Sequence, residues 1–299
     1  MPAKQHINLD LNTEVNNMTY PSRTLQEIVE YRGVEGLVAA EVLIDDNEIG
    51  EGHGYVTGAV FAIAGVAEIS KSTDSSSESH YYDNIPAIVV SSMSSDEITI
   101  NASALPMDVL ATITGQVYDE TTGALIEGPR DVKYFAIGYK TKKTNGDEIY
   151  VWRYKGTFNV PDQTNVTEDD GTDANGQELV YTGISTTHKF TKTGKGAKAI
   201  NVDTSKELAN VSTFFNVVTT PDTLVGNTAY TLTITQASNT TVSVKKNGVA
   251  LETGATIYQG DALTISVTGG TVTVNSTDWI SGDTHNVTGN VTVVSTASE

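Results

Sequence analysis

The sequence predicts a mainly β protein with one or two short helices, a long hairpin and a small C-terminal β-sandwich. Three observations predict this fold class. Apolar and polar residues alternate with the two-residue period of a strand in 96–103. Residues 134–158 hold an Asn-Gly pair between two aromatic-rich strand patterns. From residue 227 onward the chain is rich in threonine and valine, with short strand patterns separated by turn residues.

Composition sets the outer limits. The chain has 299 residues, enough for two domains or for one large β domain, and a chain of this size buries roughly 75% of its unfolded surface. It contains no cysteine, which excludes disulfides, thiolate metal sites and cysteine nucleophiles. No segment has the ~18 consecutive apolar residues of a membrane span, and the N-terminus lacks the apolar run of a signal peptide. We therefore expect synthesis in a cytoplasm and no membrane partner.

The charge is strongly acidic. The net charge is −19, of which residues 222–299 carry −4 and the first 221 residues carry −15. Such a negative field repels phosphate, so we do not expect the protein to bind the phosphate backbone of a nucleic acid. The charge has two interpretations: solubility alone, or a surface past which a polyanion moves without sticking.

The sequence of the first third of the chain predicts several strands followed by one short helix. We expect a polar lead-in or arm at 1–33, a strand at 36–44, a glycine-rich loop at 50–58, a strand at 66–70 and a serine-rich surface loop at 72–79. In 96–103 the pattern directs Ile98, Ile100 and Ala102 to one face. A short helix follows at 105–113, with Pro106 in its first turn and Gly115 at its end. Its expected buried stripe is Leu105, Val109, Leu110 and Ile113.

The hairpin at 134–158 is the most informative element. With Asn145-Gly146 as a two-residue type I′ loop, Thr144 faces Asp147 and the two strands pair with a fixed register. One face then receives an aromatic row, which consists of Tyr139, Tyr150, Trp152 and Tyr154. The other face receives Gly138 with Arg153, Lys140 with Val151, and Lys142 with Ile149. A slip of one residue would spread the aromatic row over both faces.

The last part of the chain divides near residue 221. Before it we expect an acidic loop at 165–177, a strand at 178–186 and a second helix that starts with the capping box Thr204 and Glu207. The expected buried stripe of that helix is Leu208, Val211, Phe215 and Val218. After it we expect strands at 230–235, 241–245, 263–268, 271–275 and 291–294, with hairpin turns at Asn247-Gly248 and Gly269-Gly270.

Sequence motifs for catalysis, nucleotide binding and metal binding are weak, and we predict no catalytic, cofactor-binding or metal-binding residues. The stretch 50–54, Gly-Glu-Gly-His-Gly, lacks the third glycine of a dinucleotide-binding loop. Residues 173–176 resemble the middle of a calcium loop, but Gly171 and Thr182 occupy its first and last ligand positions. The five histidines are not paired. The basic cluster of Lys189, Lys192, Lys195 and Lys198 is either a solvated loop or an inter-subunit partner for acidic loops.

Three segments in order carry a resemblance to a known family. They are the strand, Leu-Pro helix and glycine at 97–115, the strand Ala136-Ile137-Gly138-Tyr139, and the strand at 150–156, Tyr-Val-Trp-Arg-Tyr-Lys-Gly. Over residues 34–218 the chain resembles the major tail (tail tube) proteins of long-tailed, non-contractile bacteriophages. The polar N-terminal stretch departs from that pattern. Residues 222–299 are similar to the Ig-like modules often appended to such proteins.

The resemblance implies a structural subunit of the virion tail. Homohexameric rings would stack into a hollow tube that conducts viral DNA from capsid to host, without specific DNA binding. The expected protein partners are further copies and other tail proteins (tape measure, tail terminator and distal tail proteins), with weak host-surface contact as a role for the Ig-like domain. The expected domains are an arm at 1–33, a tail tube domain at 34–221 and the Ig-like domain at 222–299. The hairpin's aromatic face would pack inside the subunit, and its polar face would line the channel or meet a neighbouring subunit.

A second class of function stays open from the residues alone. A cell-surface or carbohydrate-binding β-sandwich protein, similar to an adhesin, would also be mainly β, acidic and free of catalytic motifs. Rings or tubes formed by the purified protein distinguish the tube subunit from dispersed monomers of a binding protein. An enzyme is the least supported class.

Overall fold

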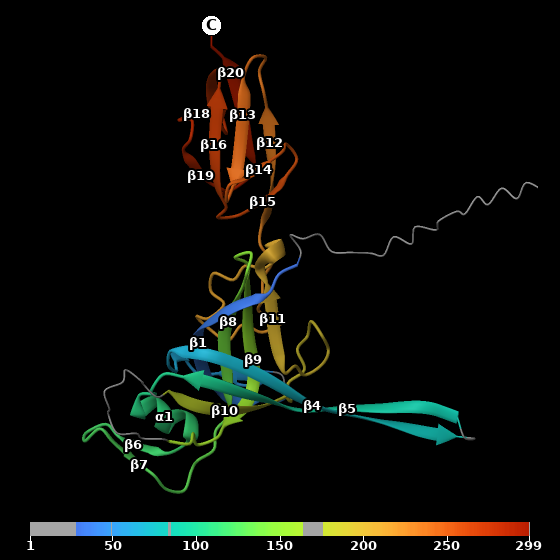
Figure 1. Cartoon of the computed structure of the whole chain (residues 1–299), viewed down its shortest axis with the longest axis vertical. Coiled ribbons are helices and arrows are strands. Elements are labelled where there is room, and N and C mark those ends of the chain that lie inside the picture. The colour runs from blue at the N-terminus through green and yellow to red at the C-terminus, as the bar shows by residue number, and fades with distance from the viewer. Residues whose placement is uncertain (1–27, 49, 83–84, 164–175, 299) are drawn as a thin grey trace, which may run out of the picture.

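A computed structural model describes residues 28–48, 50–82, 85–163 and 176–298 (Figure 1). It confirms a mainly β fold, with several sheets and, among the described residues, one α-helix. The expected acidic loop at 165–177 and the calcium-like stretch at 173–176 lie almost wholly outside the described residues, as does most of the expected arm at 1–33.

Within the described residues the largest sheet has nine strands. Its main path is β2 (Tyr55–Thr57), β1 (Tyr31–Asp45), β8 (Phe135–Lys143), β9 (Glu148–Phe158), β10 (Gln177–Ile184), β5 (Ile85–Ala102) and β4 (Val66–Tyr82). Off this path, β3 (Phe61–Ala62) pairs with β1, and β11 (Ala199–Asp203) pairs with β9. Although β1 and β4 lie near opposite ends of the path, they approach each other in space. The sheet therefore curls toward a barrel, with a seam between β1 and β4.

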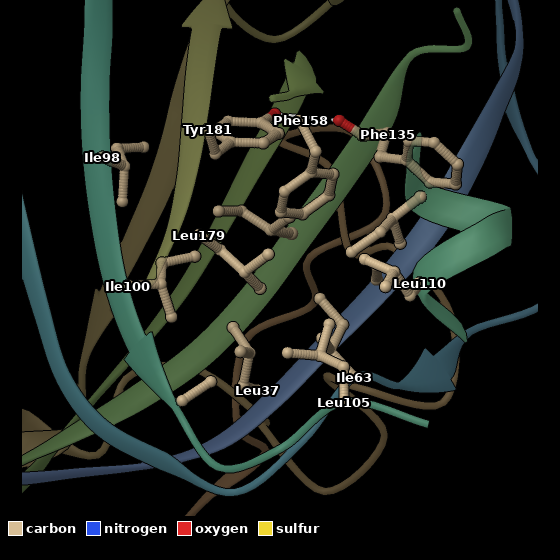
Figure 2. Close-up of a cluster of buried hydrophobic side chains, with 14 residues drawn as sticks. Leu37, Ile63, Ile98, Ile100, Leu105, Leu110, Phe135, Phe158, Leu179 and Tyr181 are labelled. Atoms are coloured by element: carbon tan, nitrogen blue, oxygen red, sulfur yellow. Dashed lines mark hydrogen bonds between the residues drawn. The ribbon is translucent and has the colours of Figure 1, made fainter. Parts of the chain in front are cut away.

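The inner face of the curled sheet carries the first hydrophobic core (Figure 2). Ile98 and Ile100 are fully buried there, as their alternation predicts, and Ala102 is buried beside them. Leu37, Phe135 and Leu179 reach the same cluster from three other strands. The buried hydroxyl of Tyr181 donates a hydrogen bond of 2.8 Å to the carbonyl oxygen of Phe135, which satisfies a polar group that burial would otherwise leave unpaired.

The predicted helix is confirmed as α1 (Met107–Thr114), which covers one end of this core. Leu105, Leu110 and Ile113 are buried against the sheet. Gly115 ends the helix at φ 72°, and its N–H bonds the carbonyl of Ala111. A Cβ at Gly115 would lie 2.0 Å from the Asp131 carbonyl oxygen, so only glycine fits. A two-stranded hairpin follows, formed by β6 (Val117–Asp119) and β7 (Ala124–Ile126).

The outer face of the same sheet carries a second core. Trp152 and Tyr154 are fully buried there, together with Phe190 and Phe214 from the segment that follows β10. The indole N–H of Trp152 donates to the Phe214 carbonyl oxygen at 2.8 Å. Both faces of the central strands thus carry buried apolar side chains, and this explains why neither face of the hairpin is purely polar.

The predicted register of the central hairpin is wrong by one residue. Gly138 pairs with Trp152, Tyr139 with Val151, and Lys140 with Tyr150. The aromatic row is therefore split: Tyr139 lies on the face of Arg153, and the other three rings lie on the opposite face. The expected polar face does not exist, because Gly138 and Arg153 are both buried.

The length and hydrogen bonds of the hairpin loop explain the shift in register. The loop has three residues, Thr144, Asn145 and Gly146, and only Gly146 has positive φ, at 94°. This is the three-residue loop in which a glycine follows a type I turn. Thr144 cannot join the ladder because its N–H donates to the Glu30 carbonyl oxygen at 2.9 Å, and its hydroxyl accepts from the Glu30 N–H at 3.2 Å.

Two further predictions are wrong. The serine-rich stretch at 72–79 is not a loop: it continues β4, and its backbone pairs with β5 from Ser72↔Glu97 to Ser79↔Val89. The second helix is only a 3-10 turn, η2 (Thr204–Lys206), because Glu207 adopts φ 53° and stops it. The Thr204 hydroxyl also bonds the backbone of Glu148 in β9, so it does not serve the expected capping box.

The C-terminal strands form two sheets around a third core. The five-stranded sheet contains β12 (Ala229–Thr235), β15 (Thr256–Tyr258), β17 (Gly270–Val274), β18 (Thr277–Trp279) and β20 (Val291–Ala297). The four-stranded sheet contains β13 (Thr241–Lys246), β14 (Val249–Leu251), β16 (Ala262–Thr268) and β19 (Thr284–Asn286). The buried core between them draws its residues from 232–293 alone. All five predicted strands occur.

The two predicted turns have different outcomes. Asn247 and Gly248 have φ of 51° and 82° and close the β13–β14 hairpin, as predicted. Gly269-Gly270 does not close a hairpin, because β16 and β17 belong to different sheets. A Cβ at Gly270 would lie 2.0 Å from the Thr296 carbonyl oxygen, so the close approach of β20 requires glycine there.

Candidate assembly surface

Strands β4 and β5 extend together beyond the large sheet as a long two-stranded projection (Figure 1). We call this projection the arm; it is distinct from the expected N-terminal arm at 1–33. Strand β10 pairs with β5 only from Ala102 to Asp96, whereas β4 and β5 continue to pair with each other as far as Tyr82↔Ile85. The stretch beyond Thr73↔Asp96 is about 30 Å long at ~3.3 Å per residue. Within the described chain both outer edges of this stretch lack a backbone partner, and Ile85 near its tip is 65% exposed.

A buried ionic cluster holds the base of the arm. The Asp96 carboxylate, in a residue 5% exposed, lies 3.2 Å from Arg153 Nη1 and 3.1 Å from Lys198 Nζ. Thr73 of β4 donates its hydroxyl to Asp96 at 3.0 Å. Arg153 also donates from Nε and Nη2 to the Tyr139 hydroxyl. The cluster therefore joins β4, β5, β8 and β9 with the segment before β11.

The charge of Asp96 is stabilised inside this cluster. Burial alone would raise the pKa of Asp96, but hydrogen bonds from Lys198 and Thr73 and the nearby positive charges outweigh it. The pKa of the carboxyl therefore lies below its ordinary value. Asp96 is ionised in the folded protein at neutral pH, and its negative charge is needed to pair the buried Arg153.

A second ionic contact links β1 to β9 and to the segment after β10 that packs on the outer core. The Asp45 carboxylate accepts from Lys155 Nζ at 2.6 Å and from the backbone N–H groups of Thr187 and His188 at 2.8 Å each. Burial raises the pKa of Asp45, yet these donors outweigh burial and hold it below its ordinary value. This contact orients the segment that carries Phe190 into the outer core.

The lysines of the hairpin are neutralised by neighbouring carboxylates. Lys140 Nζ lies 2.8 Å from Glu35 and 3.0 Å from Glu148, and Lys142 Nζ lies 3.1 Å from Glu35. The hydrogen bond to Glu35 is the largest cause of a raised pKa at Lys140. The positive charges that the sequence placed on one hairpin face are therefore not available to hold a polyanion.

The four-lysine cluster is divided. Lys198 belongs to the Asp96 cluster, whereas Lys189, Lys192 and Lys195 are exposed and make no side-chain ion pair with described residues. The glycine-rich stretch at 50–54 is organised around Asp46, whose carboxylate accepts from the Gly54 N–H at 2.8 Å and contacts His53 at 3.2 Å.

A groove of about 610 Å³ lies in the seam between β1 and β4. Its walls include Tyr31 and Val34 of β1 and Ile69 and Lys71 of β4. Its floor is the inner face of the hairpin, formed by Tyr139, Ile149, Val151 and Arg153. The arm, the free edge of β4 and this groove lie side by side, and we define them together as the candidate assembly surface.

The described residues contain no cluster of three or more potential metal ligands. No described helix has the length and hydropathy needed to cross a membrane.

The profile of the phage tail tube protein family matches residues 61–221, more than half of the chain. The chain belongs to this family. The matched region includes the arm, α1, the central hairpin and most of the outer core. Among curated proteins no sequence matches the chain. As a tail tube protein the chain is a structural component of the virion tail that assembles with itself and with other tail proteins, and the family indicates a structural rather than an enzymatic role.

Sequence reasoning missed the arm and the ionic cluster. The signal for the arm was present: β-branched residues at 88–90 follow an Asp-Asn pair at 83–84, a strand pattern after turn residues. The ionic cluster had no local signal, because Asp96, Arg153 and Lys198 are far apart in the sequence and belong to no motif.

Proposed function

We propose that this tail tube protein forms homohexameric rings that stack into a hollow tube, through which viral DNA passes from capsid to host. The observation that carries the proposal is the open strand surface of β4 and the arm. Unpaired edges of this length promote uncontrolled association unless they are covered, and a closed ring covers them in every copy. A head-to-tail contact between identical copies closes into a ring when its rotation is suitable.

The charge distribution supports passage of DNA without binding. Residues 1–221 carry −15, and the hairpin lysines are already paired with Glu35 and Glu148. A channel lined by such a surface repels phosphate, so DNA would move without being held.

We further propose a separate role for each of the two domains of the chain. Residues 34–221 would form the tail tube domain, and 222–299 an Ig-like domain that projects outward and makes weak contacts with the host surface. The separate core at 232–293 and the end of the family match at residue 221 support this division. The tape measure, tail terminator and distal tail proteins would be the other partners, after synthesis in the host cytoplasm.

Negative-stain electron microscopy of the purified full-length protein tests the proposal. We expect rings or tubes with a central channel and six-fold averages. Monomers that stay dispersed over a range of protein and salt concentrations would overturn it and favour an adhesin-like binding protein.

A further inference from the structure

The free edge of β4 borders the seam groove, and both features suit one kind of occupant. In the described chain β4 is hydrogen-bonded to β5 alone, so its other edge presents unpaired N–H and C=O groups. An added strand satisfies such groups through main-chain hydrogen bonds, and alternate side chains enter pockets beside the edge. The groove supplies those pockets, because Ile69 of β4 and Ile149 and Val151 of β9 line it.

The N-terminal sequence contains a segment with the matching pattern. In residues 7–12, Ile7, Leu9 and Leu11 alternate with Asn8, Asp10 and Asn12, and Thr13 interrupts the apolar face before Val15. A two-residue alternation of this length predicts a strand with one apolar and one polar face. A single strand of this kind is not stable alone, so it needs a sheet edge on which to pair.

The exit point of the chain gives this segment reach. Glu30 is hydrogen-bonded to Thr144 in the hairpin loop, so the chain leaves the body at the loop end of the hairpin. Twelve residues, 16–27, separate Val15 from the first described residue. Extended, they span up to about 40 Å.

We propose that residues 7–15 of a neighbouring copy add as a β-strand to the free edge of β4, with Ile7, Leu9 and Leu11 packed into the seam groove. The inference rests on the proposed assembly into rings and tubes, and it names the contact that links the copies. Exchange of the strand between copies covers the open edge in each one and makes the linkage repeat along the assembly.

Cysteine cross-linking tests the contact directly, because the natural chain has no cysteine. Two single variants, Leu9→Cys and Ile69→Cys, are mixed, assembled and oxidised with diamide. We expect a covalent dimer that contains one chain of each kind. The control mixture pairs Asn8→Cys with Ile69→Cys, and we expect far less dimer because Asn8 lies on the opposite face of the strand.

The alternative occupants give different products. A cross-link confined within one chain of the Leu9→Cys/Ile69→Cys double variant, with no dimer from the mixed singles, overturns the exchange between copies. A dimer from Ile85→Cys mixed with Ile69→Cys, with none from Leu9→Cys, places the arm tip in the groove and also overturns the proposal. Assembled tubes without any Leu9–Ile69 cross-link do the same while the proposed function stands. Absence of assembly by the wild-type chain overturns both.

A charge-matched pair of variants gives a second readout. Leu9→Asp together with Leu11→Asp puts two charges on the apolar face, and Asn8→Asp together with Asn12→Asp puts two charges on the polar face. We expect loss of rings and tubes for the first pair and normal assembly for the second, with both proteins equally folded by circular dichroism. Equal assembly of the two variants would contradict the proposal.

Discussion

At the scale of single residues, stability depends on a few buried groups that join distant segments. Trp152 is fully buried in the outer core, and its indole N–H is satisfied by Phe214. Asp96 is the shared acceptor of the ionic cluster at the base of the arm. Each of these side chains connects one of the central strands to a segment more than 50 residues away.

Replacing Trp152 by Asp should abolish soluble folding, because it places an unpaired charge in an apolar core. The measurement is the soluble fraction and the circular dichroism spectrum of the purified variant. Val160→Asp is the control: Val160 is 46% exposed, so the same charge there should be tolerated. A well-folded Trp152→Asp protein would show that this position is not buried.

Replacing Asp96 by Asn should lower the free energy of unfolding by about 3–5 kcal/mol at pH 7, because buried Arg153 loses its ionised partner. The folded pKa of Asp96 lies below its unfolded value of 3.8, so its stabilisation is complete above pH 3.8 and disappears as pH falls through the folded pKa. The difference between wild type and variant should therefore shrink in acid. Urea denaturation at pH 7 and pH 3 measures it, with exposed Asp162→Asn as the control. A constant difference would refute the linkage.

At the scale of elements, the arm and the hairpin have different relations to the body. The hairpin is covered by the second core on its outer face and by the first core along the Phe135 and Ile137 part of its inner face. The arm beyond Thr73↔Asp96 pairs only with itself among the described residues. Its folding thus contributes little to the cores, and we expect it to act in assembly.

Shortening the arm should separate folding from assembly. Replacement of residues 75–93 by an Asn-Gly turn keeps the ladder between β4 and β5 from Val66 to Thr73. We expect the thermal unfolding midpoint to change little, whereas rings and tubes disappear in electron micrographs. Normal tubes from the shortened protein would show that the arm is not an assembly contact.

Much of the fold was predictable from local patterns, and the misses have physical causes. Alternation at Ile98 and Ile100 and the end of α1 at Gly115 were predicted correctly, because each depends on neighbours in sequence. The hairpin register was not, since Thr144 is drawn into the loop by Glu30, more than 100 residues away. The assembly surface was predictable only as a sheet with open edges.

At the scale of the whole molecule, a short junction joins the nine-stranded sheet to the C-terminal sheets. Lys246 Nζ contacts Glu207 on one side and lies 2.8 Å from Asp261 on the other. Asn227 donates its side-chain N–H to the Glu207 carbonyl oxygen, and Asp222 accepts from the N–H groups of Thr191 and Lys192. Residues 222–227 are therefore hydrogen-bonded to the segment that covers the outer core.

Removal of residues 229–299 should leave tube assembly intact, because the third core contains no residue from the rest of the chain. The cut follows Thr228 so that the contacts of Asp222 and Asn227 are kept. Electron microscopy of the truncated protein is the measurement, and tubes of smaller outer diameter with an unchanged channel are the expected result. Failure of a folded truncated protein to assemble would place the C-terminal sheets in the assembly contact.

The sequence by itself determined the fold class, the position of α1, five of the nine strands of the C-terminal sheets and the tail tube family. These follow from alternation, turn residues and the order of short motifs, all of which are local. Only the tertiary structure decided the hairpin register, the continuation of the serine-rich stretch into the arm, the Asp96 cluster and the seam groove. Each of these depends on backbone or side-chain partners far away in sequence, and a local pattern carries no information about which distant group satisfies a hydrogen bond or a buried charge.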